Sequence, residues 1–227
     1  MPEIVKTADG SDTLFNELID EHYHSTFGAI QESMYIFIGA GLKIGNHEDI
    51  NLLEVGFGTG LNAYLTLLES ILSGQKIRYI TIEKYPLPAS VWSKLNYPAI
   101  IPSGNPELFR LINEATWNEE AKITENFTLL KLSCDLNEVD FSVLPAVDLI
   151  YFDAFSPEKQ PELWKTSVFQ KLSNQCSPMA RIVTYCAKGV VRRSMIESGF
   201  VVERIPGPPG KREILRGTKS PKTAIPE

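Results

Sequence analysis

The residues best suited to chemistry lie in the segment LLEVGFGTGLN, which spans positions 52–62. Three glycines, Gly56, Gly58 and Gly60, alternate with other residues directly after an apolar run that ends in Glu54. Glycine has no Cβ, so the backbone of such a loop can approach a ligand closely. A glycine-rich loop between a predicted strand and a predicted helix is typical of sites for nucleotide-like ligands.

The residues within and after this loop distinguish three classes of ligand. A nucleoside triphosphate loop needs Lys followed by Ser or Thr, but this chain has Leu61 and Asn62 there. The dinucleotide spacing G-x-G-x-x-G fails when counted from Gly56 and is met only weakly, through Ala63, when counted from Gly58. The S-adenosylmethionine pattern, apolar-apolar-acid-x-G-x-G-x-G, is matched at every position. We therefore expect the whole loop, Leu61 and Asn62 included, to bind this cofactor.

Acidic residues at the ends of neighbouring predicted strands also favour S-adenosylmethionine. This ligand carries a sulfonium and an ammonium but no phosphate, so acids suit it, whereas they would repel a pyrophosphate. We expect Glu54 to hold the cationic groups, Glu83 to accept hydrogen bonds from the ribose hydroxyls, and Asp135 to accept one from the adenine amine. Each acid alone could equally be a helix cap or a solvated loop residue, and the three positions together carry the argument.

The elements that position these residues alternate between short apolar runs and segments with helical spacing. Strands are predicted at 50–55, 77–83, 127–133, 147–153, 180–186, 200–206 and 211–217, and helices at 61–72, 86–96, 106–117, 161–176 and 189–199. Nearly continuous apolar strands indicate a parallel sheet covered on both faces. The turn between the last two strands is too short for a parallel crossover, so these strands must form an antiparallel hairpin. The expected fold is α/β, a Rossmann-like class I methyltransferase with a mostly parallel sheet.

The length of 227 residues predicts one main domain. We place an N-terminal extension at 1–46 beside the mouth of the active site, the methyltransferase domain at 47–217, and a C-terminal tail at 218–227. The sequence contains no run of 18 apolar residues, which a membrane span would need, and no secretory signal is visible. The cysteines Cys134, Cys176 and Cys186 are isolated, which argues against a metal site and favours the reducing cytoplasm.

The formal net charge of −6 is distributed unevenly. Positions 181–222 hold ten basic and three acidic residues, a net charge of +7, which leaves −13 on the rest of the chain. A basic segment on an acidic body can bind a polyanion, although a solvated basic face is the simpler interpretation.

A second chemical motif follows the fourth predicted strand. The segment DAFSP, from Asp153 to Pro157, resembles the Asp/Asn-Pro-Pro-aromatic loop of amino-group methyltransferases. Asp153 could accept a hydrogen bond from an amine, and Phe155 could stack on a planar base. Alternatively, Asp153 caps the next helix and Phe155 belongs to the core.

Four segments together are similar to one family: EVGFGTGLN, FDAFSPEKQPELW, YHSTFGAIQESMYIFIGAGL and TYCAKGVVRRSMIESGFVVERIPGPPGKREIL. They resemble the methyltransferases that complete 5-methylaminomethyl-2-thiouridine in tRNA, which occur as the methyltransferase half of bifunctional MnmC or as stand-alone MnmD. The resemblance covers positions 7–217. It implies methyl transfer from S-adenosyl-L-methionine to the exocyclic amine of 5-aminomethyl-(2-thio)uridine at the wobble position.

The resemblance also implies a set of substrate residues. They lie in the N-terminal segment, the acceptor loop and the basic segment, and comprise Tyr23, Ser25, Glu32, Ser33, Pro157, Arg192, Arg193, Lys211 and Arg212. The expected partners are tRNA and other tRNA-modifying enzymes. Bifunctional relatives carry a flavin-dependent domain for which this chain has no room, so we expect no flavin.

Two other functions stay open at this point. The chain could methylate a small amine, as a relative of polyamine synthases on the same fold, or it could bind S-adenosylmethionine without catalysis. In the favoured reaction the acceptor must be a neutral amine, whereas an alkyl amine of pKa about 10 is mostly protonated. Asp153 with an ordinary pKa would mainly orient this amine, and it could act as a base only if burial raised its pKa.

Overall fold

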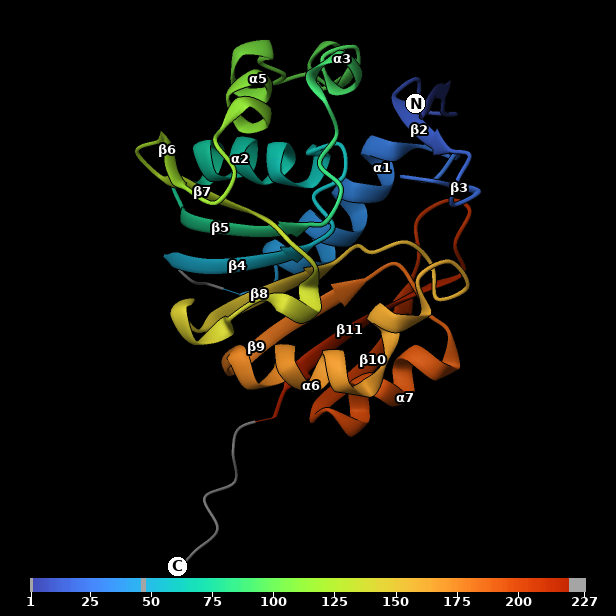
Figure 1. Cartoon of the computed structure of the whole chain (residues 1–227), viewed down its shortest axis with the longest axis vertical. Coiled ribbons are helices and arrows are strands. Elements are labelled where there is room, and N and C mark those ends of the chain that lie inside the picture. Colours follow the sequence, from blue (N-terminus) through green and yellow to red (C-terminus); the bar gives the residue numbers. More distant parts are fainter. Residues whose placement is uncertain (1, 46–47, 221–227) are drawn as a thin grey trace, which may run out of the picture.

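A computed structural model describes residues 2–45 and 48–220. Its centre is an eight-stranded sheet with the order β10-β11-β9-β8-β4-β5-β7-β6 (Figure 1). The strands are β4 (Asp49–Val55), β5 (Lys76–Glu83), β6 (Glu120–Thr124), β7 (Phe127–Ser133), β8 (Val147–Phe152), β9 (Cys176–Thr184), β10 (Phe200–Pro206) and β11 (Glu213–Lys219). Strands β7, β5, β4, β8 and β9 pair in parallel. Their carboxyl ends therefore meet at one edge, where ligands bind in such sheets.

The C-terminal hairpin is confirmed, because β10 pairs antiparallel with β11 and β11 pairs antiparallel with β9. Strand β6 was not predicted, and it adds an antiparallel edge beside β7. Strand β11 continues to Lys219, two residues past the boundary expected at 217. Lys222, counted in the basic segment, lies outside the described residues.

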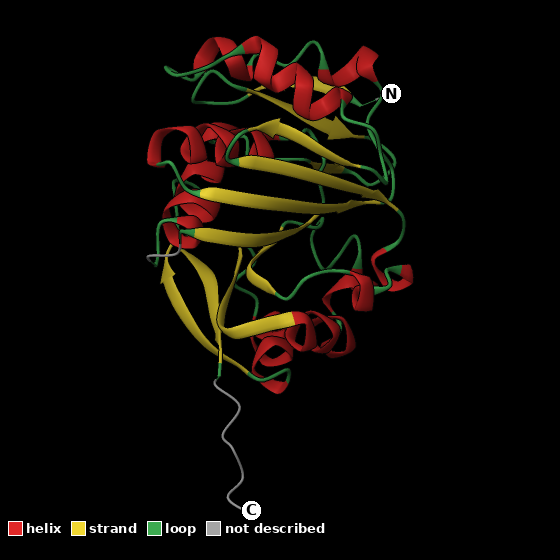
Figure 2. Cartoon of the chain, turned by 90° about the vertical axis from the view of Figure 1, so that its left-hand side faces the viewer, coloured by secondary structure: helices red, strands yellow, loops and turns green. Residues whose placement is uncertain are grey.

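Helices cover both faces of the sheet (Figure 2). They are α2 (Leu61–Ser73), α3 (Ala89–Trp92), α4 (Tyr97–Ile100), α5 (Pro106–Glu114), α6 (Thr166–Gln175) and α7 (Gly189–Glu197), with 3₁₀ turns η2 (Leu136–Glu138), η3 (Phe141–Val143) and η4 (Pro161–Trp164). Alternate residues of a strand point to opposite faces. Leu52 accordingly packs in the cluster that contains α2 and α5, and Leu53 packs with α6 and α7.

Three predicted helices are shorter in the structure. The segment 86–96 keeps only α3, and α5 ends at Glu114 instead of reaching 117. The helix expected at 161–176 is divided into η4 and α6, because Lys165 has an extended backbone with φ −72° and ψ 151°. None of the described helices is long and apolar enough to cross a membrane.

The N-terminal segment forms a small antiparallel sheet of β1 (Glu3–Lys6), β2 (Asp12–Asn16) and β3 (Glu21–His22). Helix α1 (Ala29–Ser33) follows and continues as the π-helix η1 (Met34–Leu42). The π-helix packs against α2, β8, β9 and β11. At Gly41 a Cβ would lie 3.1 Å from Val183 and 3.2 Å from Tyr151, so a glycine allows this close packing. The segment thus covers part of the sheet and reaches its carboxyl edge.

Candidate active site

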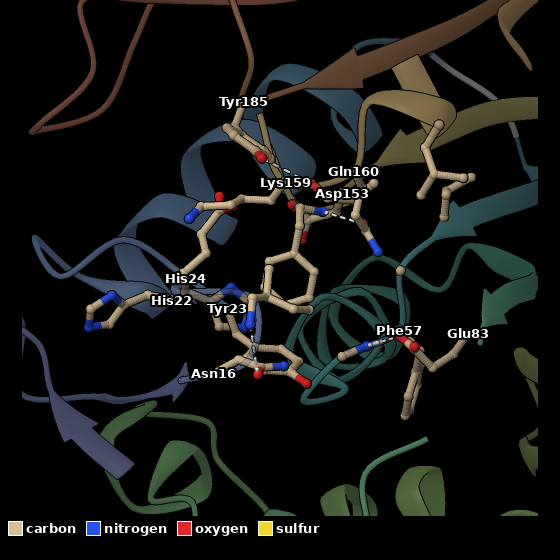
Figure 3. A pocket seen from close by; sticks show the side chains of 18 of the residues that line it. Asn16, His22, Tyr23, His24, Phe57, Glu83, Asp153, Lys159, Gln160 and Tyr185 are labelled. Atoms are coloured by element: carbon tan, nitrogen blue, oxygen red, sulfur yellow. Dashed lines mark hydrogen bonds between the residues drawn. The ribbon is translucent and has the colours of Figure 1, made fainter. Parts of the chain in front are cut away.

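A cavity of about 940 Å³ lies at the carboxyl edge of the parallel strands (Figure 3). Its walls come from the segments that follow β4, β5, β7, β8 and β9, from the N-terminal segment 16–27, and from the turn of the β10–β11 hairpin. Many of the residues expected from the acceptor loop, the strand ends and the N-terminal segment line it, including Tyr23, Ser25, Glu32, Glu83, Asp135 and Asp153. The topology therefore brings together groups that are up to 130 positions apart in sequence.

The glycine loop forms one wall of this cavity through Gly56 and Gly58. Gly56 has φ 92°, and a Cβ there would lie 2.6 Å from the carbonyl oxygen of Asp153. The amide of Gly58 donates a hydrogen bond of 3.1 Å to Oε2 of Glu83. A Cβ at Gly58 would meet the ring of Tyr23 at 3.1 Å. Glycine at these positions allows the acceptor loop and the N-terminal segment to pack against the loop.

Glu83 and Asp135 stand at the ends of β5 and β7, as the sequence predicts. Glu83 accepts from the amides of Gly58 and Tyr85, and burial raises the pKa of its carboxyl. Asp135 accepts from the amide of Asn137 and pairs with Lys84 at 2.9 Å, and these bonds lower its pKa. Both carboxylates keep oxygens at the cavity wall, where they can accept further hydrogen bonds.

Asp153 follows β8, and a residue of α2 fixes its side chain. The amide Nδ2 of Asn62 donates to Oδ2 of Asp153 over 2.8 Å. Burial raises the pKa of Asp153 well above its ordinary value, and the neighbouring charge of Glu32 raises it further. The carboxyl is therefore a much stronger proton acceptor than an exposed aspartate.

Phe155 lies beside Asp153 and forms an edge-to-face contact with Tyr23 at 5.0 Å between ring centroids. The loop that carries it is held in place by several hydrogen bonds. The indole of Trp164 donates to the Phe155 carbonyl over 2.7 Å, and Ser156 Oγ donates to Glu21 at the same distance. Trp164 closes the DAFSPEKQPELW motif, so the motif is a single folded loop that places an acid and an aromatic ring in the cavity.

Several predicted site residues do not line the cavity. Glu54 is fully buried in β4, where its carboxylate accepts from Thr81 over 2.7 Å. Its position supports no direct contact with a cofactor in the cavity, because its side chain points to the α2 face of the sheet. The other predicted residues outside the lining are Gly60, Leu61, Asn62, Ser33, Pro157, Arg192, Arg193 and Arg212. Asn62 contributes indirectly through its bond to Asp153.

The basic segment, positions 181–222, is less available to bind a polyanion than its composition suggests. Arg181 is buried, and Lys188, Arg204, Lys211 and Arg216 each pair with a carboxylate. The basic residues of this segment for which the described part of the chain shows no ion pair include Arg192, Arg193 and Arg212. These three arginines were expected to bind a polyanion, and the described residues provide no carboxylate partner that would compete with it.

The sequence analysis missed several residues of the site. Tyr185 lines the cavity just after β9 and donates to the Ala154 carbonyl over 2.9 Å. The rule that ligands lie at strand ends could have found it. Lys159 and Gln160 also line the cavity, and Gln160 accepts from the Phe155 amide. His24 is buried against Thr59 at 2.8 Å, and burial lowers its pKa to about 4, which makes it a neutral structural link to the glycine loop.

The fold and the site together define a class. A parallel sheet with an antiparallel C-terminal hairpin, a glycine loop after the central strand β4, and an acid after β5 are the features of a Rossmann-like class I methyltransferase. The sequence profile described as "S-adenosyl-L-methionine-dependent methyltransferase" matches residues 102–220. The chain belongs to this family, and S-adenosyl-L-methionine is its cofactor.

Curated relatives extend the comparison over most of the chain. The tRNA 5-methylaminomethyl-2-thiouridine biosynthesis bifunctional protein MnmC of Pseudomonas paraeruginosa (strain DSM 24068 / PA7) is 29% identical over 86% of this chain and 32% of its own length. The protein of the same name from Campylobacter fetus subsp. fetus is 30% identical over 93% of this chain and 36% of its own length. The chain thus spans about a third of the length of these relatives.

Solved structures agree with this assignment. The crystal structure of MnmC2 from Aquifex aeolicus superposes with a TM-score of 0.80 at 29% identity and covers 97% of this chain and 71% of the other. The fibrillarin/Nop5p complex gives a TM-score of 0.50 at 13% identity, covering 96% of this chain and 97% of the other, and shows the fold alone.

Proposed function

We propose that the chain transfers a methyl group from S-adenosyl-L-methionine to the exocyclic primary amine of 5-aminomethyl-(2-thio)uridine at the wobble position of tRNA. The observation that carries the proposal is the buried carboxylate of Asp153, which faces a cavity beside the glycine loop and two aromatic rings. The names of the curated relatives supply the substrate class. With tRNA as its substrate, the protein would act in the cytoplasm, next to the enzyme that produces the aminomethyl group.

The cavity fits the cofactor on structural grounds. Gly56 and Gly58 line the cavity with glycine backbone, Glu83 lies beside them through its bond from the Gly58 amide, and Asp135 lines the cavity at the neighbouring strand end. We assign Glu83 to the ribose hydroxyls and Asp135 to the adenine amine. When bound, S-adenosyl-L-methionine supplies the methyl group, and a nitrogen–carbon bond forms as the carbon–sulfur bond breaks and its electron pair leaves with the thioether.

Asp153 has two roles in this proposal. Since Asn62 fixes Oδ2, the carboxylate has one defined orientation, and it can accept an N–H bond that directs the lone pair of the amine. Its raised pKa also lets it accept the proton that the amine must lose. Phe155 and Tyr23 can hold the planar base. Alignment of the two reactants can lower the activation free energy by on the order of 7–11 kcal/mol.

Substitution of Asp153 tests this assignment. We expect Asp153→Ala to reduce methylation by at least about a hundredfold, because orientation and proton removal are both lost. Binding of S-adenosyl-L-methionine should persist, since the glycine loop and Glu83 are intact. Calorimetry that shows an equal loss of cofactor binding would instead place Asp153 in the cofactor site.

The substrate is tested with labelled S-adenosyl-L-methionine and tRNA that lacks only the final methyl group. Mass spectrometry of the digested nucleosides should then identify 5-methylaminomethyl-(2-thio)uridine. Methylation of free polyamines or other small amines, with no product in tRNA, would contradict the proposal. Cofactor binding without turnover on any amine would contradict it as well.

A further inference from the structure

Lys211 is directed into the cavity rather than toward solvent. It lies in the turn of the β10–β11 hairpin, and its Nζ is 3.2 Å from Oε1 of Glu32. The same ammonium lies 4.7 Å from the centre of the Tyr185 ring. The side chains of Lys211 and Glu32 are 26% and 10% exposed, whereas the next residue, Arg212, is exposed. Lys211 is therefore part of the cavity, unlike its neighbour.

The ion pair is held from both sides. The amide of Ser25 donates to Oε2 of Glu32 over 2.8 Å, which fixes the carboxylate. On the hairpin, the amide of Lys211 donates to the Pro208 carbonyl over 2.9 Å. Gly210 has φ 84° and packs so closely on the Phe27 ring that a Cβ would overlap it. These contacts place one positive and one negative charge at fixed positions beside Asp153.

The charges around the acceptor position would otherwise favour a protonated amine. Asp153 and Glu32 both line the cavity, and opposite charges nearby stabilise an ammonium. An ammonium has no lone pair and cannot attack a methyl group. The charged and titratable groups that interact with Lys211 are Glu32, Asp153, Tyr185 and Cys186. Glu21, Tyr23 and Lys159 line the same cavity.

We propose that the Glu32–Lys211 ion pair sets the protonation state of the bound acceptor amine, with the positive charge of Lys211 keeping the amine neutral. The inference rests on the proposed amine methylation. It moves Lys211 from the tRNA-binding surface, where the sequence placed it, to the chemistry of the cavity. Glu32 restrains the lysine and limits its effect, so the two side chains act in opposite directions.

The opposite signs give a sharp test. The single-turnover rate of methylation, measured at saturating enzyme and cofactor from about pH 6 to 10, should fall on its acidic limb as the bound amine becomes protonated. We expect Lys211→Met to move this limb up by about 1–2 pH units and Glu32→Gln to move it down by a similar amount, as Coulomb's law gives for a unit charge roughly 6–12 Å away at an effective dielectric of 20. The double variant should return toward the wild-type limb.

Two further variants serve as controls. Lys211→Arg keeps the charge and should keep the limb near its wild-type position. Arg212→Met removes the same charge from the adjacent, exposed position, so it should change the tRNA concentration needed for saturation but not the pH of the limb. Below the limb, Lys211→Met should be about 10- to 100-fold slower than wild type, and at high pH it should recover the wild-type rate, which shows that the variant is folded.

Other results would overturn the inference. A Lys211→Met rate reduced equally at every pH would show that Lys211 acts only through packing or tRNA binding. Shifts in the same direction for Lys211→Met and Glu32→Gln would also overturn it. Both results leave the proposed methylation standing, whereas a wild-type protein that methylates no tRNA at any pH contradicts the proposed function itself.

Discussion

Two buried ionisable residues, Glu54 and His24, carry pKa shifts of opposite sense near the cavity. Burial raises the pKa of Glu54 to about 7 and lowers the pKa of His24 to about 4. The folded state therefore holds a proton on Glu54 between pH 4.5 and 7 that the unfolded chain releases, so this residue's contribution to stability is lost as the pH rises. His24 is neutral when folded, and its contribution is lost as the pH falls from 6.5 to 4. The two dependences oppose each other in the overlapping range.

Removing the buried carboxylate of Glu54 should change the pH dependence of the free energy of unfolding. We expect Glu54→Gln to raise the free energy of unfolding at pH 8 by up to about 3 kcal/mol and to change it little at pH 5, where Glu54 is already protonated. Urea unfolding at the two pH values measures the difference. Glu119→Gln, at an exposed position, is the matched control and should show no such pH-dependent gain. Equal effects of Glu54→Gln at both pH values would contradict the assigned protonation.

At the scale of elements, the sequence predicted the parts of the fold that have a strong periodic signal. The five parallel strands and the C-terminal hairpin were predicted because apolar runs and a short turn define them. Strand β6 was missed because its sequence, EAKIT, is half-exposed and reads as a polar loop. The helix at 161–176 was not predicted to break, because no glycine or proline marks Lys165, where the backbone becomes extended.

The candidate site was likewise predictable only where residue positions follow from the predicted strands. Residues at strand ends, such as Glu83, Asp135 and Asp153, were predicted because their positions follow from the topology alone. The burial of Glu54 and the inward direction of Lys211 were not predicted, since both depend on which neighbours the fold brings to them. Charge counting along the sequence could not separate Lys211 from Arg212, although only one of them enters the cavity.

The glycine loop gives a prediction at this scale. Gly56→Ala places a Cβ against the Asp153 carbonyl, and alanine is strained at the positive φ of this position. We therefore expect the loop to shift and cofactor affinity to fall. Gly74→Ala is the matched control, because Gly74 has φ 75° but no atom within 4 Å of an added Cβ. It should cost about 1–2 kcal/mol of stability and leave cofactor affinity unchanged. Equal affinities for the two variants would contradict this account of Gly56.

At the scale of the whole molecule, the proposed tRNA-binding surface comprises three arginines for which the described residues show no ion pair. Charge reversal at Arg192, Arg193 and Arg212 should weaken tRNA binding and reduce the salt slope by about 0.7–0.9 for each phosphate that the protein no longer neutralises. Cofactor affinity should not change. Lys76→Glu, at the amino end of β5 and the opposite edge of the sheet, is the control for a charge reversal away from this surface. An unchanged salt slope in the triple arginine variant would rule out this surface.

The packing of the π-helix η1 has a consequence for protein synthesis. This helix leaves the ribosome before the strands β8, β9 and β11 on which it packs, and the last of these begins at Glu213. At a translation rate of about 5–20 residues per second, roughly 9–35 s separate the emergence of the helix from that of its final partner strand. During this interval its buried residues Ile36, Phe37 and Ile38 lack that partner. The nascent chain therefore presents an apolar segment that chaperones can bind before the sheet is complete.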